Sequence, residues 1–218
     1  MNSVKRSDLT LYLVTDSTGM IESEFLRTVE RACEGGVTMV QLREKDKGGL
    51  DHLNLALKVK SITDRFGVPL IIDDRIDIAM AADASGVHLG QSDIPVRFAR
   101  RILGKDKIIG ASAKTIAQAE KAKDEGADYL GVGAIYPTTT KVVTVITEVS
   151  TLNDIAVRTG LPVVAIGGLN ASNIHVLYES MADGIAVVSA VMKSKDPCGT
   201  VRSLKEQILK NFKSKTGC

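Results

Sequence analysis

The chain has 218 residues, 44% of them hydrophobic, and its 28 basic residues against 26 acidic ones give a formal net charge of +2. This length suits one sizeable core, so we expect a single domain over residues 1–218. The basic residues are scattered along the chain, which argues against nucleic-acid or membrane-surface partners but leaves small anionic ligands open.

The amino-terminal segment MNSVKRSDLTLYLVTD contains only the short apolar run Leu11–Val14. That run is too short for the core of a signal peptide or for a membrane span. The cysteines Cys33, Cys198 and Cys218 form no C-x-x-C pair and no metal-binding spacing, which is typical of reduced thiols that fill apolar space. We therefore expect a cytoplasmic protein.

Apolar, β-rich runs recur along the chain, and several are continuous, as in parallel strands that are covered on both faces. In chain order they are LTLYLVTD, TMVQLRE, PLIIDD, GVHLG, KIIGASA, DYLGVGAIY, PVVAIGG and GIAVVSAV. Helical spacing follows each run, over 22–35, 50–66, 75–83, 95–103, 115–125, 150–159, 170–181 and 197–211. Eight strand–helix units without a dividing linker predict an α/β protein with a closed (β/α)8 TIM barrel.

Each predicted strand becomes polar at its carboxyl end, which is the end where TIM barrels place their active sites. The second strand ends in QLREK, where Gln41 and Arg43 share a side-chain direction and Lys45 follows the strand. An inward arginine needs an anionic ligand or an internal carboxylate, because an unpaired buried charge is costly. The pattern alone leaves both partners open.

Carboxylates follow the next two strands, with Asp73 and Asp74 after the third and Asp93 after the fourth. Acids beside bases at one rim suit a Mg²⁺ ion that bridges carboxylate and phosphate oxygens. Each aspartate alone is equally typical of a turn or a helix cap.

Two later loops are suited to binding an anion. GAIYPTTTK (133–141) carries three consecutive threonine hydroxyls followed by Lys141, and AIGGLNASN (165–173) places Gly167 and Gly168 before a predicted helix. The loops after strands seven and eight are the usual phosphate site of these barrels, so we expect a second anion site near Gly168 and Ser189. A surface threonine loop and an ordinary glycine turn are the structural alternatives.

No nucleophile with a neighbouring base emerges from the sequence. His52 and His175 fall in predicted helices, and His88 lies in mid-strand, where a hydrogen-bonded core role is expected. The reaction therefore need not use a protein base.

Seven motifs together are similar to those of the thiamin-phosphate synthase family. They are QLREK (41–45), IDDR (72–75), GVHLGQSD (86–93), GASA (110–113), YPTTTK (136–141), AIGG (165–168) and VVSA (187–190). The resemblance implies that a hydroxymethylpyrimidine diphosphate and a hydroxyethylthiazole phosphate condense to thiamin phosphate and pyrophosphate with Mg²⁺. It also implies a dissociative substitution, in which the aminopyrimidine stabilises a methylene cation that the thiazole nitrogen attacks.

The resemblance also assigns site residues. Gln41 is assigned to recognition of the pyrimidine ring, and Ser112 to contact with the reacting centre. Asp74 and Asp93 are assigned as metal ligands. The diphosphate is assigned to Arg43, Lys45 and Lys141. The thiazole phosphate is assigned to Thr138, Thr140, Gly168, Val188 and Ser189.

Two segments depart from the family pattern. The family usually has asparagine where Asp73 stands, so an extra carboxylate lies beside the expected diphosphate unless it binds metal; we count Asp73 among the substrate-binding residues. The run KVVTVITEV from Lys141 is β-branched where the family is polar, which predicts an extra strand or a differently closing lid.

Three other functions are weighed against this one. A thiazole tautomerase of the same superfamily has no use for a diphosphate or a metal, so the retained basic and acidic motifs argue against it. A non-catalytic thiamin-precursor binding protein would result if Asp73 or the altered loop prevented ionisation. An unrelated barrel isomerase or aldolase would need a Schiff-base lysine or a glutamate base, and neither stands at a strand end. The sequence leaves the oligomeric state open, a homo-oligomer included.

Overall fold

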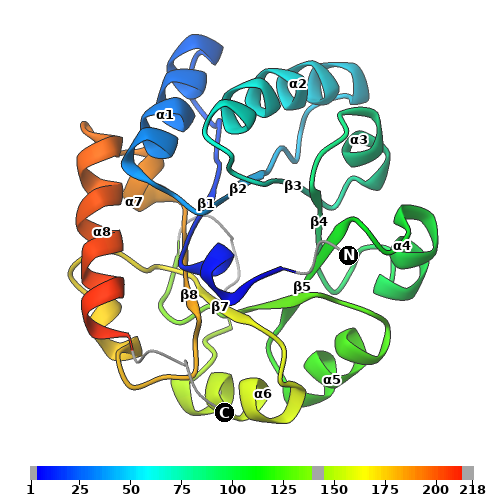
Figure 1. Cartoon of the computed structure of the whole chain (residues 1–218), viewed down its shortest axis with the longest axis vertical. Coiled ribbons are helices and arrows are strands. Elements are labelled where there is room, and N and C mark those ends of the chain that lie inside the picture. Colours follow the sequence, from blue (N-terminus) through cyan, green and yellow to red (C-terminus); the bar gives the residue numbers. More distant parts are fainter. Residues whose placement is uncertain (1–3, 139–144, 213–218) are drawn as a thin grey trace.

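The computed structural model describes residues 4–138 and 145–212. Eight parallel strands pair in sequence order and close into a barrel, with helices around the outside (Figure 1). The strands are β1 Leu11–Val14, β2 Met39–Leu42, β3 Leu70–Asp73, β4 Gly86–Leu89, β5 Ile108–Ala113, β6 Tyr129–Val132, β7 Val163–Ile166 and β8 Gly184–Val187. Each lies within one of the predicted runs, which confirms the TIM barrel.

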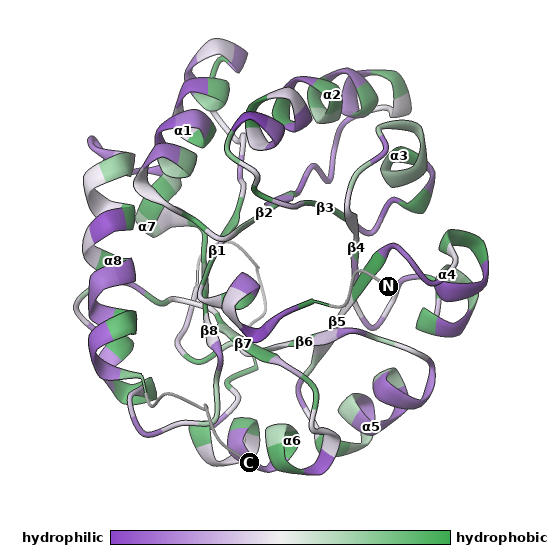
Figure 2. Cartoon of the chain, in the orientation of Figure 1, coloured by the Kyte–Doolittle hydropathy of each residue, from purple (hydrophilic) through white to green (hydrophobic). Residues whose placement is uncertain are grey.

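Most predicted helices are present within a residue or two of their expected bounds. They are α1 Glu22–Gly35, α2 Gly49–Arg65, α3 Ile76–Ala81, α4 Val96–Leu103, α5 Ile116–Asp124, α6 Val149–Thr159 and α8 Pro197–Asn211. The hydropathy colouring shows hydrophilic and hydrophobic residues alternating along these helices (Figure 2), as expected when one face packs on the barrel. In the described part of the chain, no helix is long and apolar enough to cross a membrane.

The helix predicted over 170–181 is wrong, because only the 3-10 helix η2, Ile174–Leu177, forms there. Asn170 Oδ1 accepts hydrogen bonds from both the backbone and the hydroxyl of Ser172, and Asn173 Oδ1 accepts from Asn170 N at 2.9 Å. Such side-chain bonds to the local backbone compete with helical hydrogen bonds. The segment therefore folds as consecutive turns.

Two short helices were not predicted. The 3-10 helix η1, Arg6–Leu9, precedes β1, and its Leu9 is buried in the interior of the barrel with Tyr12, Met39 and Ile71. The helix α7, Ser189–Met192, begins just after β8, where the sequence pattern predicted more strand. Both are about one turn long, which is too short for periodicity to reveal.

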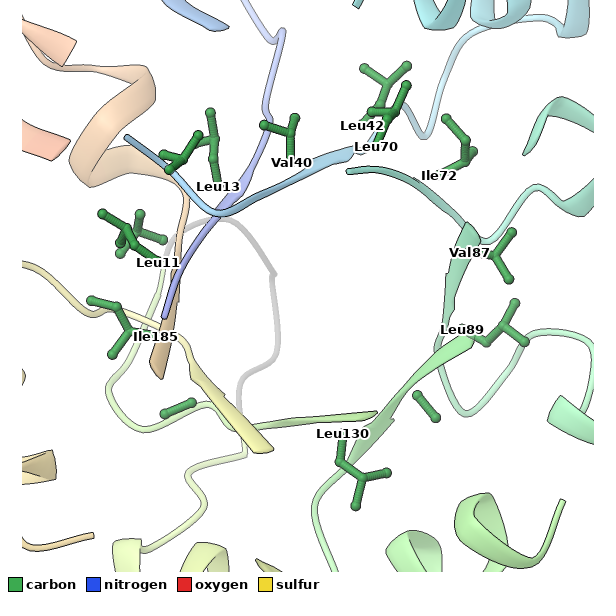
Figure 3. Close-up of a cluster of buried hydrophobic side chains, with 14 of the residues drawn as sticks. Leu11, Leu13, Val40, Leu42, Leu70, Ile72, Val87, Leu89, Leu130 and Ile185 are labelled. Carbon is green, nitrogen blue, oxygen red and sulfur yellow. The ribbon is translucent and has the colours of Figure 1, made fainter. Parts of the chain in front are cut away.

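The main core lies between the barrel and the surrounding helices. Figure 3 shows labelled side chains such as Leu13, Val40 and Leu130 pointing outward from their strands, and all three are fully buried. Each such residue contributes roughly 1.5–3 kcal/mol by leaving water. The outward strand positions thus hold the fold together, and the inward positions near the carboxyl ends are available for a site.

Candidate active site

A cavity of about 520 Å³ lies at the carboxyl ends of the strands. Every predicted site residue within the described part of the chain lines it: Gln41, Arg43, Lys45, Asp73, Asp74, Asp93, Ser112, Thr138, Gly168, Val188 and Ser189. Thr140 and Lys141 lie outside the described residues. Residues spread over about 150 positions of the sequence thus meet at one place because the barrel closes.

A cluster of charged side chains occupies the side of the cavity formed by β2, β3 and β4. Lys45 Nζ lies 2.8 Å from Asp73 Oδ2 and also contacts the carboxylate of Asp74. Arg43 Nε is 3.7 Å from the same oxygen of Asp73. The inward arginine therefore has an internal carboxylate as partner, one of the two alternatives that the sequence left open. Asp74 adopts a left-handed backbone with φ +59°, uncommon outside glycine and often found at functional sites.

Burial and neighbouring charges shift the protonation of this cluster. Burial raises the pKa of Asp73, although hydrogen bonding by Lys45 opposes it. Burial also raises the pKa of Asp93, and the neighbouring Asp74 carboxylate adds to that rise. For Asp74 burial acts in the same direction, but hydrogen bonds with Asp93 and Lys45 outweigh it and lower the pKa. Asp74 and Asp93 thus share negative charge that an added cation would stabilise.

The two carboxylates fit a Mg²⁺ ion that takes its remaining ligands from outside the protein. Asp74 and Asp93 interact directly, and both line the cavity. Within residues 4–138 and 145–212, no group of three or more His, Cys, Asp or Glu side chains is arranged to hold a metal. Magnesium commonly binds through one or two carboxylates plus water and substrate phosphate oxygens, so two ligands suffice.

The loop after β4 is held in place by hydrogen bonds of two residues of the GVHLGQSD motif. Asp93 Oδ2 accepts a hydrogen bond from Gly90 N at 2.6 Å. Gln91 Nε2 donates to the carbonyl of Ser112 at 2.6 Å, which joins this loop to β5. The contacts set the position of Asp93 relative to Ser112.

The side formed by β7 and β8 is lined by glycine and apolar residues. Gly168 has φ +66°, and a Cβ there would lie 2.7 Å from both Pro137 O and Tyr136 Cβ. The backbone of the β6–α6 loop pairs with the same turn, since Tyr136 N donates to Gly167 O at 3.0 Å. The glycines therefore have a packing role in the fold, and the role in admitting a ligand stays a prediction.

The segment after Lys141 is only partly described. Val145–Glu148 form no strand, so the predicted extra strand is absent over those positions, and residues 142–144 lie outside the described chain. Thr147 N donates to Ala134 O at 2.8 Å, which holds the end of this segment against the β6–α6 loop.

Sequence reasoning missed a hydrogen-bonded set of side chains on the cavity floor. Gln41 Nε2 donates to the Tyr12 hydroxyl, which bonds the Tyr129 hydroxyl, and His88 links Tyr129 to Ser112. The expected hydrogen-bonded role of His88 is confirmed, although His88 also lines the cavity. The available signal was the placement of Tyr12 and Tyr129 at inward strand positions, where buried hydroxyls need partners.

A family model, sequence relatives and a solved structure all connect this chain to the same family. A family model described as thiamine monophosphate synthase matches residues 11–191. The thiamine-phosphate synthase of Methanobrevibacter smithii is 51% identical over 208 residues, covering 95% of this chain and 97% of that protein, and that of Clostridium tetani is 47% identical over 192 residues, covering 88% and 92%. The solved structure of the thiamine phosphate pyrophosphorylase of Pyrococcus furiosus superimposes with a TM-score of 0.87 at 34% identity, covering 95% of this chain and 99% of that one.

Proposed function

The chain belongs to the thiamine monophosphate synthase family, and we propose that it condenses 4-amino-2-methyl-5-hydroxymethylpyrimidine diphosphate with 4-methyl-5-hydroxyethylthiazole phosphate. The products are thiamin phosphate and pyrophosphate. As a member of this family the protein is a transferase of thiamine biosynthesis. The observation that carries the proposal is a single cavity with a charged side and a glycine-lined side, which suits two phosphorylated substrates.

The charged side would bind the diphosphate. Arg43 and Lys45 line the cavity; Arg43 pairs with Asp73, and Lys45 pairs with Asp73 and Asp74. A diphosphate would replace part of these contacts with stronger anionic ones, because arginine can bind phosphate oxygens through two parallel hydrogen bonds. Lys141 stays a predicted third cation of this subsite.

Asp74 and Asp93 would hold Mg²⁺, which supplies positive charge to the departing diphosphate when it is bound. The support is the close pair of carboxylates: burial raises the pKa of Asp93, and hydrogen bonding with Asp74 raises it further. The side chain of Asp74 keeps its contact with Lys45, so cations of two kinds would face the same leaving group.

The proposed reaction is a dissociative substitution. The bond from the pyrimidine methylene to the diphosphate oxygen breaks with its electron pair on the oxygen, and the ring stabilises the methylene cation. The thiazole nitrogen then forms the new C–N bond with its own lone pair, so no proton leaves the nucleophile. Gln41 would orient the pyrimidine, because an amide offers both a donor and an acceptor. Both ring nitrogens of His88 are already hydrogen-bonded, which agrees with a reaction that needs no protein base.

The glycine-lined side would bind the thiazole phosphate. Thr138 offers a hydroxyl, while Gly168, Val188 and Ser189 line the cavity at the ends of β7 and β8. Small residues let the backbone approach phosphate oxygens closely. Thr140 stays a predicted member of this set.

The direct test is an assay with both phosphorylated precursors, with and without Mg²⁺, that follows thiamin phosphate and pyrophosphate together. We expect Mg²⁺-dependent formation of both products, and a fall of about 10²–10³-fold in turnover for Lys45→Ala and for Asp74→Ala. Lys58→Ala is the matched control, because Lys58 pairs with Glu22 at 2.6 Å on the surface and has similar exposure, 48% against 42% for Lys45.

Absence of both products with the unmodified protein would refute the synthase. Interconversion of thiazole phosphate tautomers would then favour the isomerase, and binding without turnover would favour the non-catalytic protein. Whether thiazole carboxylate tautomers serve as substrates can be read in the same assay. The cytoplasmic location and any homo-oligomer stay predictions.

A further inference from the structure

A continuous chain of hydrogen bonds, here named the floor relay, crosses the bottom of the cavity. Gln41 Nε2 lies 2.9 Å from the Tyr12 hydroxyl, which lies 2.9 Å from the Tyr129 hydroxyl. His88 Nδ1 is 3.0 Å from the Tyr129 hydroxyl, and His88 Nε2 is 2.9 Å from Ser112 Oγ. The relay thus joins the two residues that we expect to meet the pyrimidine and the reacting centre.

Two glycines make room for the rings of the relay. Gly110 of β5 is in register with His88 on one side and Tyr129 on the other, and a Cβ there would lie 2.1 Å from the Tyr129 ring. A Cβ at Gly131 would lie 3.0 Å from the His88 ring. The centroids of the His88 and Tyr129 rings are 5.5 Å apart. The absence of a Cβ at the two glycines of β5 and β6 lets these rings approach so closely.

Both tyrosines keep their protons. Tyr12 and Tyr129 are almost fully buried, and burial raises the pKa of each phenol well above its ordinary value. A neutral hydroxyl has a single proton, so it donates one hydrogen bond and accepts others. Tyr129 is not among the residues that line the cavity, so any effect it has on a substrate must pass through its neighbours.

The relay has a direction because each link holds one proton. With Gln41 Nε2 as the donor, Tyr12 donates to Tyr129 and Tyr129 donates to His88 Nδ1. A neutral His88 then carries its proton on Nε2 and donates to Ser112 Oγ. The Ser112 proton is left to point at a ligand. In the opposite direction the Gln41 amide would be turned, Ser112 would donate its proton to His88 Nε2, and Ser112 could only accept a hydrogen bond from a ligand.

We propose that the floor relay holds His88 as its Nε2–H tautomer and thereby fixes Ser112 as a hydrogen-bond donor to an anionic oxygen at the reacting centre. The inference rests on the proposed function, which assigns that oxygen to the departing diphosphate. Tyr12, Tyr129 and His88 are positioning residues, since they act through Gln41 and Ser112. Aligned hydrogen bonds polarise one another, so breaking a middle link weakens the donor at the end.

The first test reads the tautomer in the substrate-free protein. With ¹⁵N-labelled histidine the chain gives three pairs of ring signals, from His52, His88 and His175, and His88→Gln identifies the relevant pair. We expect the proton on Nε2 in the unmodified protein and a shift toward Nδ1–H in Tyr129→Phe, which removes the donor to Nδ1. Tyr178→Phe is the control, because Tyr178 packs on Phe212 away from the cavity. An Nδ1–H signal for His88 in the unmodified protein would overturn the proposal.

The second test is kinetic. Tyr129→Phe should lower kcat about 10–100-fold while KM for the thiazole phosphate stays within about twofold, because the relay lies under the reacting centre. A kcat equal to that of Tyr178→Phe would overturn the proposal. If Tyr129→Phe does not fold, Tyr12→Phe breaks the preceding link and carries the same expectation. Should the unmodified protein show no synthase activity, the proposed function fails, whereas the tautomer measurement still decides whether the relay exists.

Discussion

The two sides of the cavity are built from different parts of the chain. On the β2–β4 side the lining is charged, and Asp73 Oδ2 lies within 4 Å of both Arg43 Nε and Lys45 Nζ. On the β7–β8 side, the described lining residues are uncharged, and Gly168 brings the backbone of a neighbouring loop close. A charged side chain in the cavity can be replaced without shifting the backbone. A new side-chain atom where two backbone segments pack closely forces one of the segments to move. The two sides should therefore fail in different ways when they are altered.

The largest effect is expected from removing a charge on the β2–β4 side. Arg43→Ala should lower turnover about 10²–10³-fold without a large change in the free energy of unfolding, because it removes a cation that the proposed function places beside the leaving group. Arg43→Lys should recover part of the loss, since it restores the charge but not the paired hydrogen bonds. Steady-state kinetics and urea unfolding measure the two quantities. Arg97→Ala, at a surface pair with Glu125, is the control. Equal activity of Arg43→Ala and Arg97→Ala would contradict the assignment.

A methyl group on the β7–β8 side should act through the backbone. Gly168→Ala should raise KM for the thiazole phosphate about 10-fold or more and destabilise the fold, because the new Cβ meets Pro137 O and Tyr136 at 2.7 Å. Gly160→Ala separates the causes, since Gly160 has a similar φ of +67° but no atom within 4 Å of its Cβ. Gly160→Ala should lower the free energy of unfolding by only about 1–2 kcal/mol. If both variants lose the same stability and keep the same KM, close packing at Gly168 is unimportant.

A smaller effect is expected from Asp73, a carboxylate that lies beside the cations of the β2–β4 side. Asp73 Oδ2 lies 2.8 Å from Lys45 Nζ, so under the proposed function Asp73 would compete with the diphosphate for that cation. Asp73→Asn should lower KM for the pyrimidine diphosphate about 3- to 10-fold, which corresponds to roughly 1 kcal/mol. Initial rates at varied diphosphate substrate give the value. A rise in KM would instead mean that Asp73 helps to bind the substrate, either directly or through metal.

The smallest effect concerns a carboxylate that faces away from the cavity. The Glu44 side chain is 5% exposed; its Oε2 accepts from Ser17 Oγ at 2.8 Å, and its Oε1 has no hydrogen-bond partner within the described chain. Burial raises the pKa of Glu44, with Ser17 and Lys47 opposing that rise. Because the folded state holds this proton more tightly, the stability contributed by Glu44 is largest at low pH and falls as the pH rises above about 4.5 toward the raised pKa.

Glu44→Gln removes this charge. The variant should gain about 1 kcal/mol or less relative to the unmodified protein at pH 7, and the gain should vanish near pH 4. Urea unfolding at both pH values measures it. A gain that does not change with pH would show that the charge of Glu44 is not the cause.

Much of the fold followed from local pattern. Continuous apolar runs such as Leu70 to Ile72 and Val163–Ile166 indicate strands covered on both faces, and the helical spacing between such runs predicted the barrel. Where polar side chains near one another could bond the backbone, as at Asn170 and Asn173, the local pattern misled, because periodicity does not weigh such bonds.

Some features of the candidate site could likewise be predicted from the sequence, and others depended on the closed barrel. Polar residues and glycines at the strand ends, such as Arg43, Asp74 and Gly168, were found from the sequence because strand direction alone puts them at one rim. Which of them touch depended on closure of the barrel, as with Lys45 and Asp73. The Tyr12–Tyr129 contact, between residues 117 positions apart, exists only because closure of the barrel brings both side chains into its interior and Gly110 leaves space for a ring. Strand direction is a local property of the chain, whereas the distance between two side chains is a property of the closed fold.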